Sequence, residues 1–361
     1  MDAFDARTEE LLDVLRRYQG RRLFVAVLGS PDPDGLASAW ALKLLAREAG
    51  ATLDILTFEV VSRPDNVAFV QQLGIPFRQV TRQLPRLGYA AYAVVDRQNA
   101  HLPVPVRRGL PMIIHIDHHV PVPTGAQFSQ QEPGFGSTCA IMAYHFATLF
   151  RTGHVDPNEA CRVATALMHG IRTDTGDFVT CGALDFRAAS LLAPLVSTEL
   201  SRSIVNMPLG RTFLDTLTVA LPTVLTRDGL TIAYAGKVGR RARDTIGQTA
   251  DFLIRTEGTR TVVVFGLVNG SYVGSLRTSS PTFDPYDFLD DALSDRLGFP
   301  VDCGGRAFAG GFQVPLASMP GDDEEASRAI LIDAILDTWN RRETALRRLS
   351  RRGPRGARPG R

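Results

Sequence analysis

The stretch Pro111–His119, PMIIHIDHH, decides how the rest of the chain is interpreted. It begins as an apolar run that predicts a buried β-strand, and it ends in Asp117, His118 and His119, three groups that resist burial. A charged carboxylate in an apolar interior costs several kcal/mol unless it is paired or bound to a metal. The strand is therefore expected to end at a functional site, provided that other acidic residues end other strands nearby.

Apolar strands alternate with helical segments over the first half of the chain. The segments LFVAVL, TLDILTFEV, AAYAVVD and PMIIHID have the composition of strands, and the segments between and after them are mostly helical in periodicity. Continuous apolar strands that alternate with helices are typical of a parallel sheet covered on both faces. We therefore predict an α/β fold with a parallel-sheet N-terminal domain and helices on both of its faces.

A second, smaller α/β domain is predicted after a stretch of little clear periodicity. LTIAYAG, TVVVFGLVNG and SYVGSLRT have the composition of strands, and Asn269-Gly270 supplies a hairpin turn. CGGRAFAGG is interpreted as a glycine-rich loop that enters a last strand. The predicted order is an N-terminal domain at 1–194, a linker at 195–225, a smaller domain at 226–320, a helix at 321–349 and a disordered basic tail at 350–361.

Composition excludes several classes of protein. The net charge of +2 gives no whole-protein electrostatic argument for nucleic acid. The four cysteines have no CxxC spacing, which indicates reduced thiols in a cytoplasmic protein rather than a disulfide framework or a zinc site. No apolar stretch approaches the roughly 20 residues that span a bilayer, and the N-terminal segment lacks the pattern of a secretory signal.

Acidic residues recur where predicted elements end. They are Asp32 and Asp34 in PDPDG, Asp96 in VVD, Asp117 in DHH and Asp174 in TDTG. In a parallel α/β sheet the carboxyl ends of the strands meet at one crevice, so these acids and the two histidines are expected to converge. Carboxylates gathered that closely repel one another unless a cation neutralises them. Oxygen ligands with one or two imidazoles suit Mn²⁺ or Mg²⁺, and two such ions form a common device for splitting phosphate esters.

Each acid taken alone has a simpler explanation. An Asp in PDPDG is more often a turn or helix cap than a ligand, and Asp96 and Asp174 could also be plain turn residues. These simpler explanations are favoured by about three to one for any single residue. The joint pattern changes the odds, because unrelated turns need not all fall at one edge of a sheet.

In order, PDPDG, VVD, DHH and TDTG resemble the four motifs of the DHH phosphoesterase superfamily. CGGRAFAGG resembles the glycine-rich signature of the C-terminal domain associated with them. The resemblance covers roughly residues 20–316 and is greatest for the branch of oligoribonucleases (nanoRNases) that also dephosphorylate 3′-phosphoadenosine 5′-phosphate (pAp). It implies a cytoplasmic hydrolase in which two Mn²⁺ or Mg²⁺ ions activate a water that attacks a short oligonucleotide, a dinucleotide or pAp, with no membrane partner and often as a homodimer.

The resemblance also implies roles for particular residues. The metal ligands would be Asp32, Asp34, Asp96, His118 and Asp174. With His119, which would face the substrate phosphate, they form the implied catalytic set, and Asp117 would orient a histidine. The implied substrate-binding residues are His119, Arg277, Gly304, Gly305, Arg306 and Gly310. In this picture the second domain would close over the substrate and supply specificity.

Two positions depart from the family pattern. Leu28 stands where many relatives carry a metal-binding histidine, so one metal would be held more weakly. Arg306 stands where relatives commonly carry the histidine of Gly-Gly-His; arginine can bind phosphate in a bidentate manner but cannot donate a proton at neutral pH. Three alternatives therefore stay open: a cyclic-dinucleotide phosphodiesterase, a hydrolase of pyrophosphate or polyphosphate, and a nucleotide-binding sensor with weakened chemistry.

Overall fold

The computed structural model describes residues 3–106, 109–206, 210–306, 308–321 and 323–351, with the side chains of Arg306 and of residues 346–351 outside that description. The chain divides into two units, Met1–Pro208 and Leu209–Arg361, each with its own sheet. Within the described residues, no helix is both long and apolar enough to cross a membrane.

The sheet of the first unit is entirely parallel and has six strands. In spatial order they are β3 (Phe77–Gln79), β2 (Thr52–Thr57), β1 (Arg22–Val27), β4 (Ala91–Val95), β5 (Met112–Asp117) and β6 (Phe128–Gln131). The chain runs outward in one direction from β1 to β3 and in the other from β4 to β6. The order therefore reverses between β1 and β4, which is the position where α/β sheets open a crevice at the carboxyl ends of their strands.

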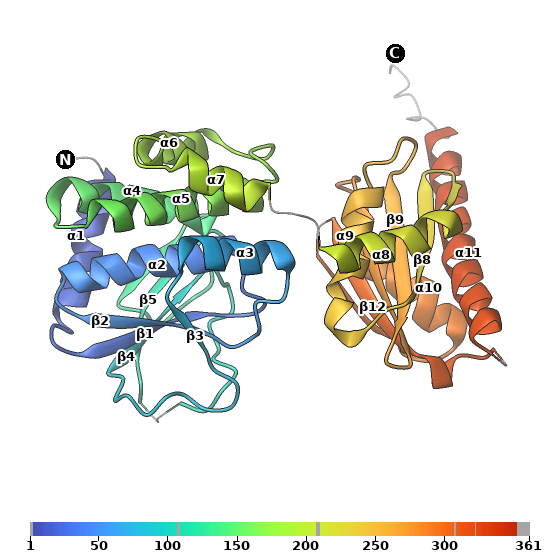
Figure 1. Ribbon diagram of the computed structural model, residues 1–361, viewed down its shortest axis with the longest axis horizontal. Coiled ribbons are helices and arrows are strands. Elements are labelled where there is room, and N and C mark those ends of the chain that lie inside the picture. The colour runs from blue at the N-terminus through green and yellow to red at the C-terminus, as the bar shows by residue number, and fades with distance from the viewer. Residues whose placement is uncertain (1–2, 107–108, 207–209, 307, 322, 352–361) are drawn as a thin grey trace, which may run out of the picture. The chain divides into compact units, whose positions relative to one another are not determined.

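Helices cover one face of this sheet (Figure 1). They are α1 (Ala3–Arg16), α2 (Pro33–Glu48), α3 (Pro64–Leu73), α4 (Thr138–Thr152), α5 (Pro157–Asp174), α6 (Ala183–Leu192) and α7 (Thr198–Val205). Alternate residues of β1, such as Leu23 and Val25, belong to the apolar core that these helices complete. The intervening residues Phe24 and Ala26 face a second cluster built from strands and loops, without a residue from any described helix.

The expected α/β class is thus confirmed, while the second face of the parallel sheet is covered by loops where helices were expected. Leu28 belongs to this second cluster and is 9% exposed. Its apolar side chain is therefore accounted for by packing at the end of β1.

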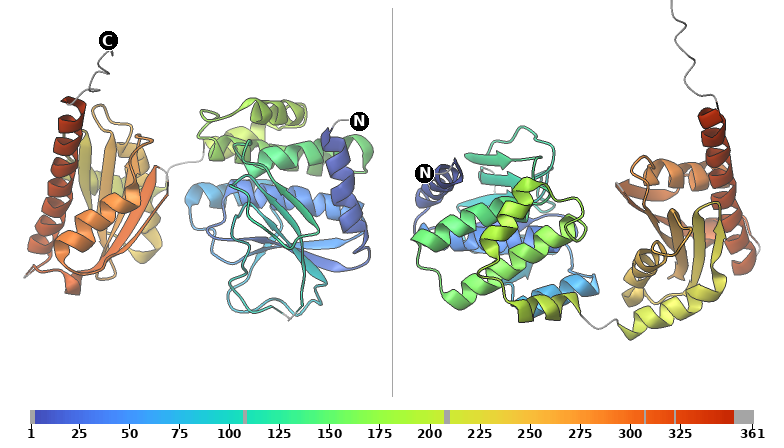
Figure 2. Two further views of the ribbon diagram at one scale, coloured as in Figure 1. Left: turned by 180° about the vertical axis from the view of Figure 1, so that it is seen from behind. Right: turned by 90° about the horizontal axis from the view of Figure 1, so that it is seen from above.

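The second unit has a mixed sheet with helices on both faces (Figure 2). Its strands, in spatial order, are β11 (Asp302–Arg306), β12 (Ala309–Pro315), β10 (Ser271–Thr278), β9 (Thr261–Val268), β8 (Leu230–Lys237) and β7 (Leu225–Arg227), and only β8 and β9 pair in parallel. α8 (Arg211–Ala220) and α9 (Asp244–Leu253) pack on one face, and α10 (Pro285–Leu297) and α11 (Glu324–Arg351) pack on the other. Short 3₁₀ turns lie at Leu221–Thr223, Arg240–Ala242 and Leu316–Ser318.

Three details differ from the sequence-based expectation. The stretch 195–225 is largely helical, because it holds α7, which packs on α3 and α5, and α8, which packs on β8 and α9. Most of the glycine-rich segment, where a loop was expected, lies in the antiparallel strands β11 and β12. The last helix continues to Arg351, and the rest of the predicted basic tail, residues 352–361, lies outside the described residues.

Candidate metal centre

Most of the predicted acids follow strands at the point where the strand order reverses. β1 ends at Val27 and leads to Asp32, the N-cap of α2, and to Asp34 in the first turn of that helix, while β4 ends at Val95, directly before Asp96. The neighbouring β5 ends at Asp117, which His118 follows. The parallel topology therefore brings the first three motifs to one edge of the sheet.

Asp32 and Asp34 are held by two helix N-termini. Asp32 is the N-cap of α2, and its Oδ1 accepts a hydrogen bond from the Gly35 amide at 3.0 Å. Asp34 is 1% exposed, and its two oxygens accept hydrogen bonds from the amides of Thr138 and Cys139 at 2.8 and 2.6 Å. These amides lie at the start of α4, where unpaired backbone N–H groups attract a carboxylate. Each of these two residues can therefore bind a helix N-terminus and still belong to the acidic cluster.

Asp96 occupies an unusual backbone conformation. Its φ is +54°, a left-handed value that few residues other than glycine, asparagine and aspartate adopt. Its Oδ1 accepts a hydrogen bond from the Thr138 hydroxyl at 3.2 Å. A Cβ atom added to Gly35 would lie 3.3 Å from Asp96 Oδ2 and 3.6 Å from Asp32 Oδ1, so the two carboxylates flank the same glycine.

His118 links Asp96 to the fourth motif. Its Nε2 lies 3.2 Å from Oδ2 of Asp174, the last residue of α5, and 3.6 Å from Oδ1 of Asp96. Two sets of potential ligands share His118: Asp96, His118 and His119 form one, and Asp34, His118 and Asp174 form the other, with the donor atoms of each set within 4.8 Å of one another. Asp32 is in neither set, although its charge acts on Asp34, Asp96 and Asp174.

The carboxylates of the cluster repel one another electrostatically. Burial, and then the charge of Asp32, raise the pKa of Asp34 to about 6. Burial and the charge of Asp34 raise the pKa of Asp174 to about 7, and the same causes raise the pKa of Asp96 well above its usual value. Burial lowers the pKa of His118. The raised pKa values of the carboxyl groups and the lowered pKa of His118 both disfavour the charged form of the side chain. The imidazole therefore does not supply the positive charge that would balance three carboxylates.

Asp117 and His119 form a hydrogen-bonded pair beside the cluster. His119 Nδ1 donates to Asp117 Oδ1 at 2.7 Å, and this bond raises the pKa of His119. Burial raises the pKa of Asp117, but the hydrogen bond from His119 and its charge outweigh burial and lower it. Asp117 is fully buried, whereas the side chain of His119 is 49% exposed. The buried carboxylate therefore fixes an exposed imidazole whose Nε2 stays available.

Several supporting residues were not predicted from the sequence. A Cβ at Gly170 would lie 2.3 Å from Cys139 Sγ and 3.2 Å from Asp34 Cα, so this glycine lets α5 approach the cluster. Asp185, which is 1% exposed, accepts hydrogen bonds from the amides of Gly136 and Gly182, both at 2.8 Å. It thereby holds the turn that leads into α4. The apolar periodicity of α5 and α6 gives no signal for either role.

Three of the substrate-binding residues predicted in the second unit, Arg277, Gly305 and Gly310, contact other residues of that unit. Arg277 Nε donates to Asp251 Oδ1 at 2.6 Å. A Cβ at Gly305 would lie 2.8 Å from the Tyr286 amide nitrogen, and one at Gly310 would lie 2.9 Å from Cβ of Pro285. The lack of a side chain at both glycines therefore leaves room for the start of α10. Gly304 has open space instead. The Arg306 side chain lies outside the described residues.

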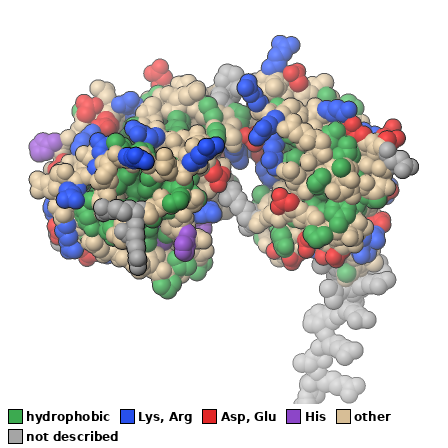
Figure 3. Space-filling model, turned by 90° about the horizontal axis from the view of Figure 1, so that it is seen from below, with side chains coloured by type: hydrophobic (Ala, Val, Ile, Leu, Met, Phe, Trp, Pro, Cys, Tyr) green, Lys and Arg blue, Asp and Glu red, His purple; other side chains and the backbone are tan. Residues whose placement is uncertain are grey.

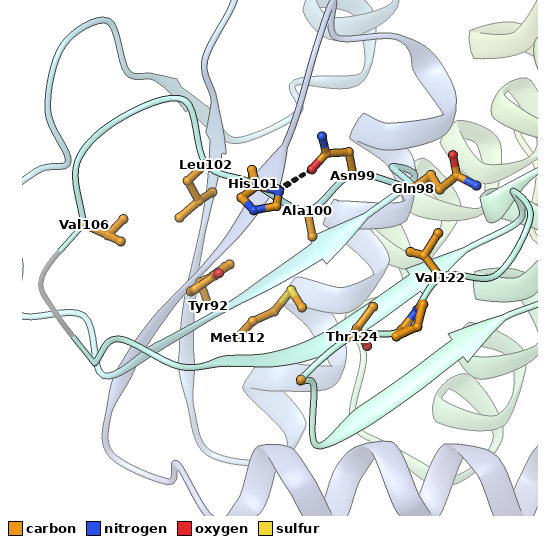
Figure 4. Close-up of a pocket in the computed structure, with 12 residues that line it drawn as sticks. Tyr92, Gln98, Asn99, Ala100, His101, Leu102, Val106, Met112, Val122 and Thr124 are labelled. Atoms are coloured by element: carbon orange, nitrogen blue, oxygen red, sulfur yellow. Dashed lines mark hydrogen bonds between the residues drawn. The ribbon is translucent and has the colours of Figure 1, made fainter.

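A pocket of about 640 Å³ lies in the first unit (Figure 4). Its walls come from Tyr92 of β4, Met112 of β5 and the loops after these two strands. The twelve described residues that line it include no charged side chain and none of the predicted site residues. Within it, His101 Nδ1 and Asn99 Oδ1 lie 2.6 Å apart.

Charges of both signs are present on the face drawn in Figure 3. There, lysine and arginine side chains lie beside apolar and acidic ones on both units, which agrees with the small net charge.

The donor chemistry of the cluster fits divalent cations that prefer oxygen. Its donor atoms are carboxylate oxygens and the imidazole nitrogens of His118 and His119, a set that suits Mn²⁺ or Mg²⁺ and lacks the thiolates of most structural zinc sites. The amides that bind Asp34 leave lone pairs free on both oxygens, because a carboxylate has about four acceptor positions. The assignment of individual ligands stays a prediction.

No family model matches the sequence. The chain is 30% identical over 311 residues to the uncharacterized protein MJ1633 of Methanocaldococcus jannaschii; the match covers 85% of this chain, which spans 61% of that protein's length.

Two solved structures share the fold. One is an exopolyphosphatase-related protein from Bacteroides fragilis, with a TM-score of 0.62, 13% identity, and coverage of 92% of this chain and 96% of that one. The other is the exonuclease RecJ bound to manganese, with a TM-score of 0.52, 15% identity and coverage of 94% of both chains. At such low identity these likenesses show the fold alone. The chain therefore shares the fold of these two proteins, and its membership of the DHH phosphoesterase superfamily stays a prediction from the ordered motifs.

Proposed function

We propose that the protein is a divalent-metal-dependent phosphoesterase that hydrolyses short nucleotides. The observation that carries this proposal is the convergence of Asp34, Asp96 and Asp174 around His118 where the strand order reverses. The mutual repulsion of these groups is a cost to the fold that bound cations would remove. The likeness to manganese-bound RecJ supports the same kind of site at the level of the fold.

Asp34, Asp96, Asp174 and His118 would hold two cations, with Asp32 as a further carboxylate at the rim. When bound, the ions would act as Lewis acids on a phosphoryl oxygen and on the attacking water. Asp117 keeps the Nδ1 proton of His119 in place, so Nε2 is the nitrogen left to contact a phosphate oxygen. Because the pKa of His119 is raised, this imidazole is more often protonated near neutral pH than a free one, which suits a negatively charged substrate.

The substrate class is argued from the sequence. The glycine-rich signature at 303–311 resembles the nucleotide-handling type, which favours dinucleotides, short oligonucleotides or pAp. The exopolyphosphatase-related neighbour makes pyrophosphate or polyphosphate the second candidate. A cyclic dinucleotide is a third, and a sensor without turnover is a fourth, since Leu28 packs in an apolar cluster where many relatives have a metal-binding histidine.

The test is a turnover assay with Mn²⁺ on a dinucleotide, pAp, cyclic di-AMP and pyrophosphate. We compare the wild type with Asp96→Asn, because asparagine accepts the positive φ of this residue while removing its charge. Loss of the several kcal/mol that a metal ion contributes predicts a fall in kcat/KM of at least about a thousandfold.

Asp228→Asn is the matched control. Asp228 also has a positive φ, +49°, but lies in the turn between β7 and β8 of the second unit. We expect this variant to retain wild-type turnover. Retained turnover in Asp96→Asn would remove Asp96 from the catalytic set, and silence of the wild type on all four substrates would favour the sensor.

A further inference from the structure

The loop that follows Asp174 has an unusual backbone. Gly176, Asp177 and Phe178 are consecutive residues with φ values of +58°, +59° and +68°. A left-handed conformation costs about 1–2 kcal/mol for a residue other than glycine, and a bulky aromatic residue seldom adopts it. Such strain persists only where the surrounding structure enforces it.

Hydrogen bonds close this loop tightly. The amide and the hydroxyl of Thr180 both donate to the carbonyl of Thr175, at 3.0 and 3.2 Å, and the Asp177 amide donates to the carbonyl of Arg172 at 2.7 Å. The side chains of Arg172 and Asp177 add an ion pair at 2.7 Å. Because Thr180 returns to Thr175, the Cα atom of Val179 stays within roughly 13 Å of that of Asp174, given 3.8 Å between neighbouring Cα atoms.

The closed loop, which begins directly after Asp174, and the start of the next helix expose apolar side chains. Val179 is 83% exposed, and Phe186, at the start of the following helix α6, is 54% exposed. The rings of Phe178 and Phe186 stack with an interplanar angle of 22° and centroids 6.5 Å apart. Large exposed apolar side chains grouped in this way commonly mark a binding surface.

We propose that Phe178, Val179 and Phe186 form the subsite for the base of a nucleotide whose phosphate lies at the carboxylate cluster. This inference rests on the proposed function and assigns its substrate class. The position of the loop suggests a nucleotide as the ligand, because the loop begins directly after Asp174. The distance from Asp174 to the end of the loop is of the same order as the distance between the phosphate and the base of a nucleotide. Stacking on an aromatic ring accepts any base, whereas pyrophosphate and polyphosphate have no group to place there.

A binding experiment tests the subsite without turnover. In Phe186→Trp, the new indole would sense a base directly, and the wild type with Trp40 and Trp339 gives the background fluorescence. In the full-length protein with Mn²⁺, adenosine 5′-monophosphate should quench the added emission at concentrations where ribose 5-phosphate, which lacks the base, does not. An equal response to both ligands, or to neither, would overturn the proposal.

A kinetic experiment adds a second readout. Phe186→Ala should raise the KM for a nucleotide by about tenfold to a hundredfold while leaving the KM for pyrophosphate unchanged, since stacking is worth roughly 1.4–2.8 kcal/mol per base. Leu191→Ala is the matched control, because Leu191 is an exposed apolar residue of the same helix, 43% exposed, outside the proposed subsite. An equal rise for both substrates would contradict a base subsite.

The two proposals fail in different ways. If no phosphate ester is hydrolysed but the indole responds to adenosine 5′-monophosphate alone, the proposed function fails and the subsite stands. If nucleotides and pyrophosphate are hydrolysed while the indole stays silent, the function stands and the subsite is wrong. Sedimentation of the wild type and of Val179→Asp adds one more outcome: a dimer that this substitution dissociates would show that a second copy occupies the surface, which also overturns the subsite.

Discussion

The two units of this chain treat their charged side chains differently. In the first unit, the parallel sheet gathers carboxylates at one edge, where burial and neighbouring negative charge raise the pKa of Asp34 and Asp174, and both share the imidazole of His118. In the second unit, the mixed sheet carries charges in opposite pairs, such as Arg277 with Asp251 and Lys237 with Glu324. There the hydrogen bond from Lys237 lowers the pKa of Glu324.

The difference follows from topology. Parallel strands all end on the same side, so polar residues placed after several strands must meet. Antiparallel strands end alternately on opposite sides, which separates such residues. A charge imbalance retained at a convergent edge indicates a ligand that balances it, whereas a balanced pair needs none.

The largest expected effect concerns Asp174 in protein stripped of metal. Its pKa is about 7 in the folded protein and about 3.9 in an unfolded chain, so between these values the folded state binds the extra proton. The contribution of Asp174 to the free energy of unfolding therefore falls as pH rises from about 4 to 7. We expect metal-free Asp174→Asn to gain stability over the wild type across this window, by roughly 3 kcal/mol at the upper end.

Urea denaturation of both proteins with a chelator, at several pH values, measures this gain. The quantity to compare is the difference in the free energy of unfolding between wild type and variant at each pH. His145 and His169, with pKa values of about 3 and 4, make both proteins more stable as the pH rises, and this contribution cancels in the difference. Saturating Mn²⁺ should reverse the order and leave the wild type the more stable. A gain independent of pH would show that Asp174 carries no repelled charge.

A smaller effect is expected at Asp185, a buried carboxylate that is fully satisfied. Asp185→Asn keeps the shape of the side chain but turns an acceptor into a donor that faces an amide, which should destabilise the protein by about 1–3 kcal/mol. The control is Asp177→Asn, an exposed residue with positive φ whose ion pair with Arg172 should contribute less than about 1 kcal/mol. If the urea midpoints of both variants fell equally, the buried carboxylate of Asp185 would contribute no more to stability than the exposed carboxylate of Asp177, which would contradict the prediction.

Sequence reasoning succeeded where a pattern maps directly onto topology. Apolar strands that alternate with helices predicted the parallel sheet, and the acids after β1, β4 and β5 therefore had to approach one edge. Asp174 was harder to place, since it ends a helix rather than a strand. The ordered motifs supplied that position, and the 3.2 Å approach of His118 to Asp174 agrees with it.

What the sequence could not supply depends on contacts between distant segments. Asp34 receives two amides of α4, more than a hundred residues away, and no local pattern encodes that pairing. Gly305 and Gly310 are predicted to bind substrate, and they also leave room for the start of α10, a role that the glycine pattern by itself does not reveal. Loops cover the second face of the parallel sheet because the apolar loop residues Val80, Tyr89 and Leu102 pack there, and short apolar segments of this kind lack any periodicity.

The smallest expected effect separates the two units. Asp251→Asn removes the partner of Arg277, but both side chains are partly exposed, so the free energy of unfolding should fall by only about 0.5–1 kcal/mol. The affinity for Mn²⁺, measured by calorimetry on the full-length protein, should not change, because Asp251 and Arg277 pair with each other and neither is a candidate metal ligand. Asp174→Asn should weaken that affinity by at least about tenfold, since it removes a candidate ligand. If Asp251→Asn altered Mn²⁺ binding to a similar extent, this ion pair of the second unit would be coupled to the carboxylate cluster, and the contrast between paired and unbalanced charges would fail.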